Sequence, residues 1–121
     1  MRRTATATVG AYALAAIAMA IPPVAHADAV AYLVAVTVRP GYNFPNADAA
    51  LSYGYGICDR VGHRYSYADD IAAVKSDLGT NDEYQAAYLI NQAVNELCPE
   101  LIWQLRQSAT GYMSGRDSGA S

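Results

Sequence analysis

Side chains that bind metals are scarce in this sequence. It holds two cysteines, Cys58 and Cys98, and two histidines, of which only His63 lies beyond residue 27. Two thiolates and one imidazole do not complete a tetrahedral zinc shell without carboxylates. The acidic pairs at 69–70 and 82–83 do not follow the spacing of an EF-hand calcium loop. We therefore expect no metal and no cofactor.

A catalytic set is missing as well. A histidine that acts as a base needs a nucleophile and an orienting carboxylate. Ser66 and Asp69 are close to His63 in the sequence, but both are better explained as residues that cap a helix. We expect that the protein is not an enzyme and has no catalytic residue. A small hydrolase built on His63 is the alternative.

Basic residues are outnumbered. Eight lysines and arginines face eleven aspartates and glutamates, which gives a net charge of −3. Nucleic acids and anionic membrane surfaces bind proteins that present a basic face. We therefore expect no nucleic acid as a partner, and no membrane once an N-terminal signal has been removed.

No apolar run is long enough to span a bilayer, which takes ~20 residues. The longest, Val9–Ile21, is rich in alanine and carries no charge. It follows Arg2 and Arg3, and positive charges before an apolar run of ~7–15 residues are typical of a secretory signal peptide.

The end of this segment matches a cleavage site. The prolines at 22–23 end any helix there, and 25–27 reads Ala-His-Ala, the small-x-small pattern of signal peptidase sites. We expect residues 1–27 to be removed between Ala27 and Asp28, which leaves a protein that is secreted or held in the cell envelope. An uncleaved N-terminal anchor is the alternative.

Helical periodicity and capping residues follow. The first expected helix is capped by Asp28 and ends at Pro40-Gly41. The second runs from Asn46 to Gly62 and the third from Ser66 to Gly79. Thr80 and Glu83 open the fourth as a capping box, it ends at Cys98, and a short segment from Pro99 to Gln107 follows. The first is rich in β-branched residues, so a strand is its alternative. In the helix ending at Cys98, we expect a buried stripe made of Tyr84, Ala87, Tyr88, Asn91, Val94, Leu97 and Cys98.

These patterns predict an all-α fold, a small bundle of about four helices. It forms one domain over residues 28–107, and the Gly- and Ser-rich residues 108–121 are expected to form a disordered tail. Gly54 and Gly56 lie inside a helix, where each costs roughly 1 kcal/mol relative to alanine. We interpret them as the place where another helix crosses closely; room for a ligand is the alternative.

The two cysteines bracket most of this helical region. Disulfides form in oxidising compartments, and small exported domains use them because their cores are modest. We expect a bond between Cys58 and Cys98 that staples the bundle. Two free thiols are the alternative.

Tyrosine is the one abundant aromatic residue, with ten copies against one phenylalanine and one tryptophan. Tyrosine is amphipathic and enriched at recognition surfaces. Tyr53, Tyr55, Tyr65 and Tyr67 cluster around His63 in the sequence, and these five residues are our candidate binding surface. The alternative is that the rings cover a small core.

Two motifs carry a family resemblance. Gly54-x-x-x-Cys58 is followed by a helix that reads Ala-x-x-x-Ile-x-x-Ala-Val-x-x-x-Cys-Pro over residues 86–99. Residues 28–99 thereby resemble the small secreted actinobacterial proteins, chiefly mycobacterial, grouped as domain-of-unknown-function family 732. The resemblance implies a compact helical domain with the Cys58–Cys98 bridge, and it implies no activity.

Taken with the missing catalytic set, these observations predict an exported, monomeric, non-enzymatic interaction or binding module. Its partner, a protein or a small molecule, is not identified by the sequence. The alternative is an extracytoplasmic carrier of a small molecule or haem, with a pocket between helices near Gly54 and Tyr88.

Overall fold

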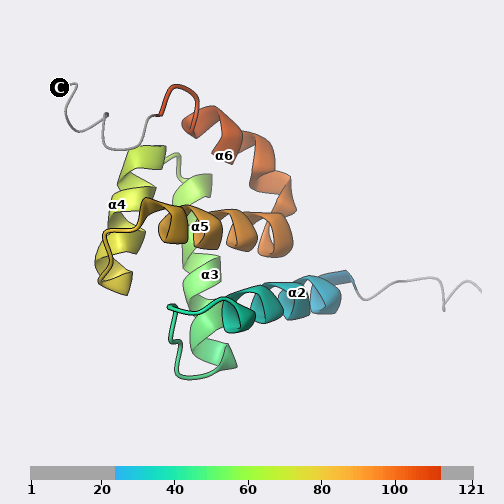
Figure 1. The fold of residues 1–121 in the computed structure, drawn as a ribbon. Coiled ribbons are helices and arrows are strands. Elements are labelled where there is room, and N and C mark those ends of the chain that lie inside the picture. Colours follow the sequence, from blue (N-terminus) through green and yellow to red (C-terminus); the bar gives the residue numbers. More distant parts are fainter. Residues whose placement is uncertain (1–23, 113–121) are drawn as a thin grey trace, which may run out of the picture.

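The structure is a computed structural model that describes residues 24–112. Most of the predicted signal peptide, residues 1–23, and the last part of the predicted tail, residues 113–121, lie outside the described residues. The elements are α2 (Val24–Val38), α3 (Ala47–Gly62), α4 (Tyr67–Leu78), α5 (Glu83–Leu97), the 3-10 turn η2 (Pro99–Leu101) and α6 (Ile102–Ser108) (Figure 1). The all-α prediction is confirmed, with five α-helices in the described part of the chain instead of about four.

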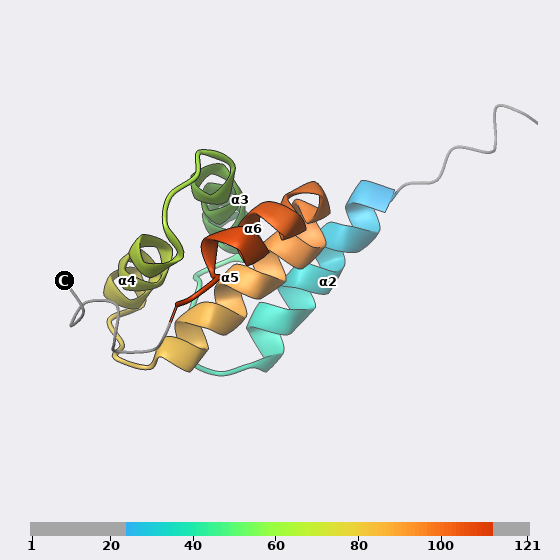
Figure 2. The same ribbon diagram turned by 90° about the horizontal axis from the view of Figure 1, so that it is seen from above.

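Helix α5 is the centre of the bundle. Helices α2, α3 and α4 all pack against it (Figure 1), and in the view from above α2 lies on one side of it and α4 on the other (Figure 2). Its fully buried side chains recur at three and four residues: Ala86, Leu89, Ile90, Ala93 and Val94. The predicted stripe is confirmed at Val94 and Cys98, which are buried, and was wrong at Tyr84, whose side chain is 75% exposed. The apolar face of α5 is the one that carries Ala86, Leu89 and Ala93, and this is the face that packs into the core.

Most predicted caps are confirmed. The Asn46 side chain accepts a hydrogen bond from the Ala49 amide at 2.8 Å, and Ser66 Oγ accepts one from the Asp69 amide at 3.0 Å. Gly79 ends α4 in the left-handed conformation, which glycine adopts without strain. These interactions satisfy amide and carbonyl groups that a helix end leaves without partners.

Two N-termini differ from the prediction. Asp82, rather than Thr80, caps α5: its carboxylate accepts from the amides of Tyr84 and Gln85, while Thr80 Oγ1 accepts from the Asp82 amide. Helix α2 begins at Val24, so Asp28 lies inside the helix instead of capping it. An aspartate is as good a cap as a threonine, and local pattern alone does not separate neighbouring candidates.

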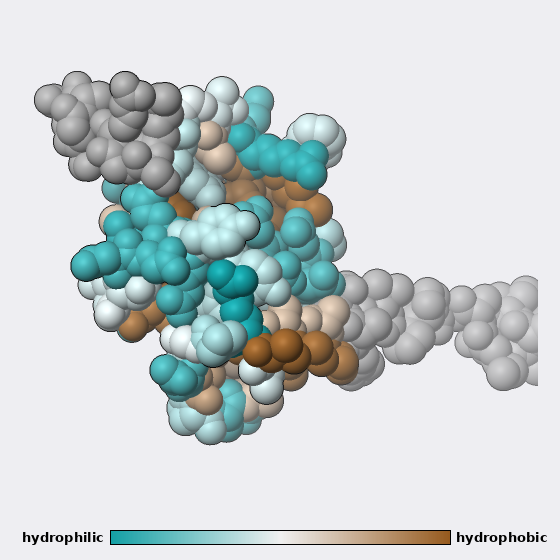
Figure 3. Space-filling model, viewed as in Figure 1, coloured by the Kyte–Doolittle hydropathy of each residue, from teal (hydrophilic) through white to brown (hydrophobic). Residues whose placement is uncertain are grey.

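The first predicted element is a helix, not a strand, and its buried residues follow helical spacing. Tyr32 and Val36, four residues apart, are buried against the core, and the helix ends before Pro40-Gly41 as predicted. Its outer side carries three exposed valines, Val30, Val34 and Val38, and Figure 3 shows an apolar patch over α2. No helix within residues 24–112 is long and apolar enough to cross a membrane.

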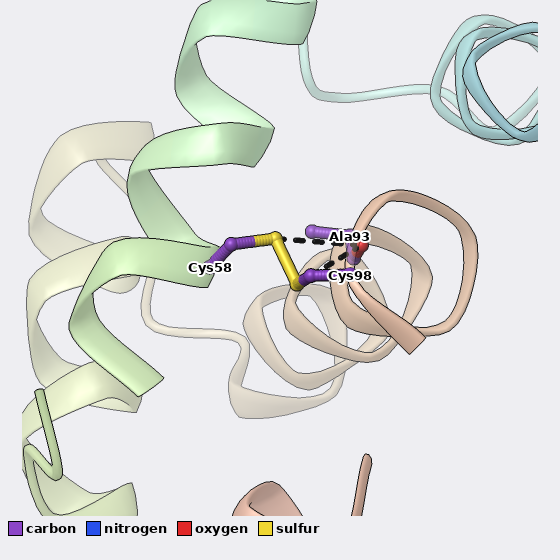
Figure 4. Close-up of a disulfide and its surroundings, with 3 residues drawn as sticks. All are labelled: Cys58, Ala93 and Cys98. Atoms are coloured by element: carbon purple, nitrogen blue, oxygen red, sulfur yellow. Dashed lines mark hydrogen bonds between the residues drawn. A yellow bond between two sulfur atoms is a disulfide. The ribbon is translucent and has the colours of Figure 1, made fainter. Parts of the chain in front are cut away.

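The predicted disulfide is present. Cys58 and Cys98 are bonded, with their Cα atoms 6.2 Å apart, within the expected range of ~4.4–6.8 Å. Both cysteines are buried, and both sulfurs lie 3.9 Å from the carbonyl oxygen of Ala93 (Figure 4). The bond thus joins α3 to the end of α5 inside the core.

The chain stays packed beyond Gln107, where we placed the end of the helical domain. Helix α6 continues to Ser108, and the Tyr112 ring meets the Tyr67 ring edge-on at 5.0 Å between centroids. Tyr112 Oη also donates a hydrogen bond to Glu83 at 3.0 Å. Packing therefore reaches Tyr112, the last described residue.

Candidate functional site

The structure does not bring the five predicted surface residues together. Tyr53 is half-buried in a groove between α3 and α4, whereas Tyr55 and His63 line a separate hollow beside the disulfide. Tyr65 is 47% exposed, and Tyr67 packs against Tyr112. Positions two apart in a helix point about 200° away from each other, so Tyr53 and Tyr55 cannot share a face.

Side chains occupy the space beside Gly54, where the carrier's pocket was predicted. A Cβ atom at Gly54 would lie 2.6 Å from Leu97 Cδ1 and 2.8 Å from Tyr32 Cζ, so another helix does cross closely at this glycine. Tyr88 stacks against Tyr42 with ring centroids 6.4 Å apart. The packing interpretation is confirmed at Gly54, where Leu97 and Tyr32 fill the space beside the glycine.

Gly56 has the opposite surroundings. Apart from its own stretch of helix, nothing in the described residues lies within 4 Å of the place where its Cβ would stand, and Gly56 lines a groove of about 530 Å³. Ile57 on α3 and Ala73 and Val74 on α4 give the groove an apolar lining, which Phe44 and Tyr53 extend. The close-crossing interpretation was therefore wrong for Gly56, and its alternative, open space, is what the structure has.

Two polar bridges join α3 to α4 along this groove. Tyr53 Oη donates a hydrogen bond to Asp77 Oδ2 at 2.7 Å, and Arg60 Nε donates one to Asp70 Oδ1 at 3.2 Å. On α3 the two bridging residues are seven positions apart, which is roughly 10 Å along a helix. The bridges hold the helices together at both ends of an apolar stretch. Burial, together with the bond to Asp77, raises the pKa of the Tyr53 hydroxyl.

Aromatic residues that we had not grouped assemble beside the groove. Phe44 lies between Tyr42 and Tyr53, at centroid distances of 6.5 Å and 5.6 Å. The Arg39 guanidinium stands 4.4 Å from the Tyr88 ring centroid. Tyr42-x-Phe44 between two prolines was the available signal, because it places two aromatic rings in one short loop.

Asp70 is the one buried charged side chain of the described core. It is 1% exposed, and its Oδ2 has no hydrogen-bond partner among the described residues. Burial raises the pKa of this carboxyl above its ordinary value of 3.8, and the bond and charge of Arg60 oppose part of that rise. The ionised form is thus less favourable in the folded protein than in the unfolded chain.

This raised pKa predicts a pH-dependent difference between the protein and an Asp70→Asn variant. Above pH 3.8, Asp70 loses its proton more readily in the unfolded chain, so the wild-type free energy of unfolding falls as pH rises through the raised pKa. Asparagine does not titrate. We expect the stability of Asp70→Asn relative to wild type to increase with pH across this window, measured by urea unfolding at several pH values. If the stability of Asp70→Asn relative to wild type stayed constant or decreased with pH, the raised pKa of Asp70 would be contradicted.

Most of the described chain matches one known protein family. Residues 26–100 match the family described as a protein of unknown function, DUF732. The chain belongs to the DUF732 family. The match confirms the resemblance noted from the two motifs, and it includes both cysteines, both polar bridges and the whole groove. In this DUF732 protein, α6 follows the matched region. Searches of curated proteins and of solved structures gave no match.

Proposed function

We propose that this DUF732 protein is an exported, non-enzymatic binding module, and that the groove between α3 and α4 is its ligand site. The observation that carries the proposal is Gly56. A glycine inside a helix costs about 1 kcal/mol relative to alanine, and at this position no neighbouring side chain requires it. Because Gly56 has no side chain, the groove stays open at this position.

The size and lining of the groove support a small ligand. Pockets for small molecules typically measure about 300–1,000 Å³ and are mostly apolar with a few polar groups. At about 530 Å³ the groove lies in this range. Its polar groups stand at the two bridges, where Asp77 and Arg60 meet the apolar stretch.

The other parts of the proposal have separate support. The disulfide between the two cysteines fits an oxidising compartment outside the cytoplasm, as does the signal pattern at the N-terminus. His63, the only histidine beyond the predicted signal, lies with Nδ1 2.7 Å from the Asp59 carbonyl oxygen at the end of α3. Among the described residues it has no hydrogen bond to a hydroxyl group or a carboxylate, which a catalytic histidine would need.

A neutral fluorescent probe tests the site. N-phenyl-1-naphthylamine should bind with saturable fluorescence enhancement, and Gly56→Leu should weaken binding about tenfold or more because the added side chain fills the groove. Ala72→Leu adds the same side chain to an exposed position of α4 outside the groove and should leave binding unchanged. No saturable binding, or equal binding by Gly56→Leu, would contradict the proposed site.

A further inference from the structure

Arg60 is placed at the groove with most of its hydrogen-bonding capacity unused. Its Nε–H donates to Asp70, and its side chain lines the groove while remaining 34% exposed. A guanidinium has five N–H donors in a rigid planar fork. Within residues 29–112, no hydrogen bond to the protein uses the two terminal nitrogens of Arg60. The described protein therefore leaves four donors of this groove-lining residue unused.

The guanidinium is also held in place. Asp70, fully buried, holds its Nε side, and the Tyr65 ring lies 5.0 Å from its central carbon. A donor group that is already oriented loses less conformational entropy when a ligand binds. Arg60 therefore presents a pre-oriented fork to the groove.

The other described cations are placed differently. Arg39 stacks on Tyr88, and Lys75 Nζ lies 3.5 Å from a carboxylate oxygen of Glu83. Arg106 stacks on the exposed Trp103, and Arg64 is exposed outside the groove. Among the cations of the described chain, Arg60 is the one that lines the groove between α3 and α4.

The two ends of the groove differ in charge. Asp77, bonded to Tyr53, makes one end unfavourable for an anion, while the terminal nitrogens of Arg60 make the other end favourable. Between them lie Gly56, Ile57 and Val74, which offer no charge and roughly 10 Å of length. The groove thus has an anion-binding end and an apolar body.

We propose that the ligand is an amphipathic carboxylate, with its carboxylate on the terminal nitrogens of Arg60 and an apolar body of roughly 10 Å lying over Gly56. This inference rests on the proposed function and names the ligand class of that same groove. Guanidinium–carboxylate pairs form two parallel hydrogen bonds and are among the stronger polar contacts in proteins.

Three compounds with the same eight-carbon body test the inference: octanoate, octanamide and octylammonium. Binding is followed by the amide NMR shifts of Gly56, Ile57 and Val74. Octanoate should bind about tenfold more tightly than octanamide, with octylammonium weakest. An Arg60→Gln/Asp70→Asn double variant should reduce octanoate affinity about tenfold, to the level of octanamide, and leave octanamide unchanged. Changing both residues avoids burying an unpaired Asp70 carboxylate, and Arg64→Gln, an exposed arginine outside the groove, is the control for overall charge.

The outcomes separate the two proposals. Equal affinity for octanoate and octanamide, or a preference for octylammonium, would overturn the carboxylate class while probe binding keeps the groove as the site. A preference for octanoate that survives in the double variant would overturn the role of Arg60. Failure of all three compounds while N-phenyl-1-naphthylamine binds would also overturn the ligand class alone. Failure of the neutral probe itself would remove the proposed function.

Discussion

Replacing both cysteines by serine is expected to lower the free energy of unfolding by about 2–4 kcal/mol. The bond closes a loop with a sequence separation of 40 residues that contains the end of α3, all of α4 and all of α5. Without it, the unfolded chain gains the conformational freedom of that loop, and two polar hydroxyl groups replace buried sulfurs. The core of so short a domain leaves little margin for the loss.

Differential scanning calorimetry measures this effect. In a domain of this length each kcal/mol shifts Tm by about 4–8 °C, so the Cys58→Ser/Cys98→Ser variant should melt at least ~10 °C below the oxidised protein. The reduced wild-type protein is the matched control and should melt close to the variant, because it too lacks the bond. An unchanged midpoint in the variant would mean that the helices hold together without the disulfide.

Placing leucine at position 54 is expected to cost about 3 kcal/mol or more, because the core has no room for even one added carbon there. A Cβ atom alone would stand 2.6 Å from Leu97 Cδ1 and 2.9 Å from Tyr32 Oη. Tyr32 is fully buried, and its hydroxyl donates to the Ala50 carbonyl oxygen at 2.9 Å. To admit the new side chain, α2 would have to move off α3 and give up this hydrogen bond.

The matched control is the same substitution two residues later. At Gly56 an added Cβ meets no neighbouring group within 4 Å, and leucine there replaces a glycine inside a helix, so Gly56→Leu should raise the free energy of unfolding by roughly 0.5–1 kcal/mol. Urea unfolding of both variants measures the contrast. Equal effects of the two substitutions would mean that the close crossing at 54 and the open groove at 56 are misassigned.

Local chemistry explains what was predictable from the sequence. Asn46 and Ser66 cap helices through amides three residues away, and Gly79 ends one through its own backbone freedom, so each feature depends on neighbours in the chain. The disulfide was predictable for a different reason: with two cysteines, an intramolecular bond has one possible pairing. The family match likewise follows from motifs that lie in the sequence itself.

The tertiary structure decided the features that depend on which helix lies against which. Tyr84 and Leu89 both fit a helical stripe of α5, and only the docking of α2, α3 and α4 around α5 buried the second and left the first exposed. The same holds for the aromatic residues, because Phe44 meets Tyr53 through the path of the loop between α2 and α3.

The candidate site is the clearest case. Gly54 and Gly56 look alike in the sequence, yet one sits under α2 and the other opens onto the groove. The bridging pairs are separated by 24 residues for Tyr53–Asp77 and by 10 for Arg60–Asp70. The sequence determined which residues were available, namely an arginine, two aspartates, a tyrosine and a helical glycine. Their assembly into one groove was set by the antiparallel docking of α3 and α4, because side chains on separate helices meet only when packing fixes the position and rotation of both helices.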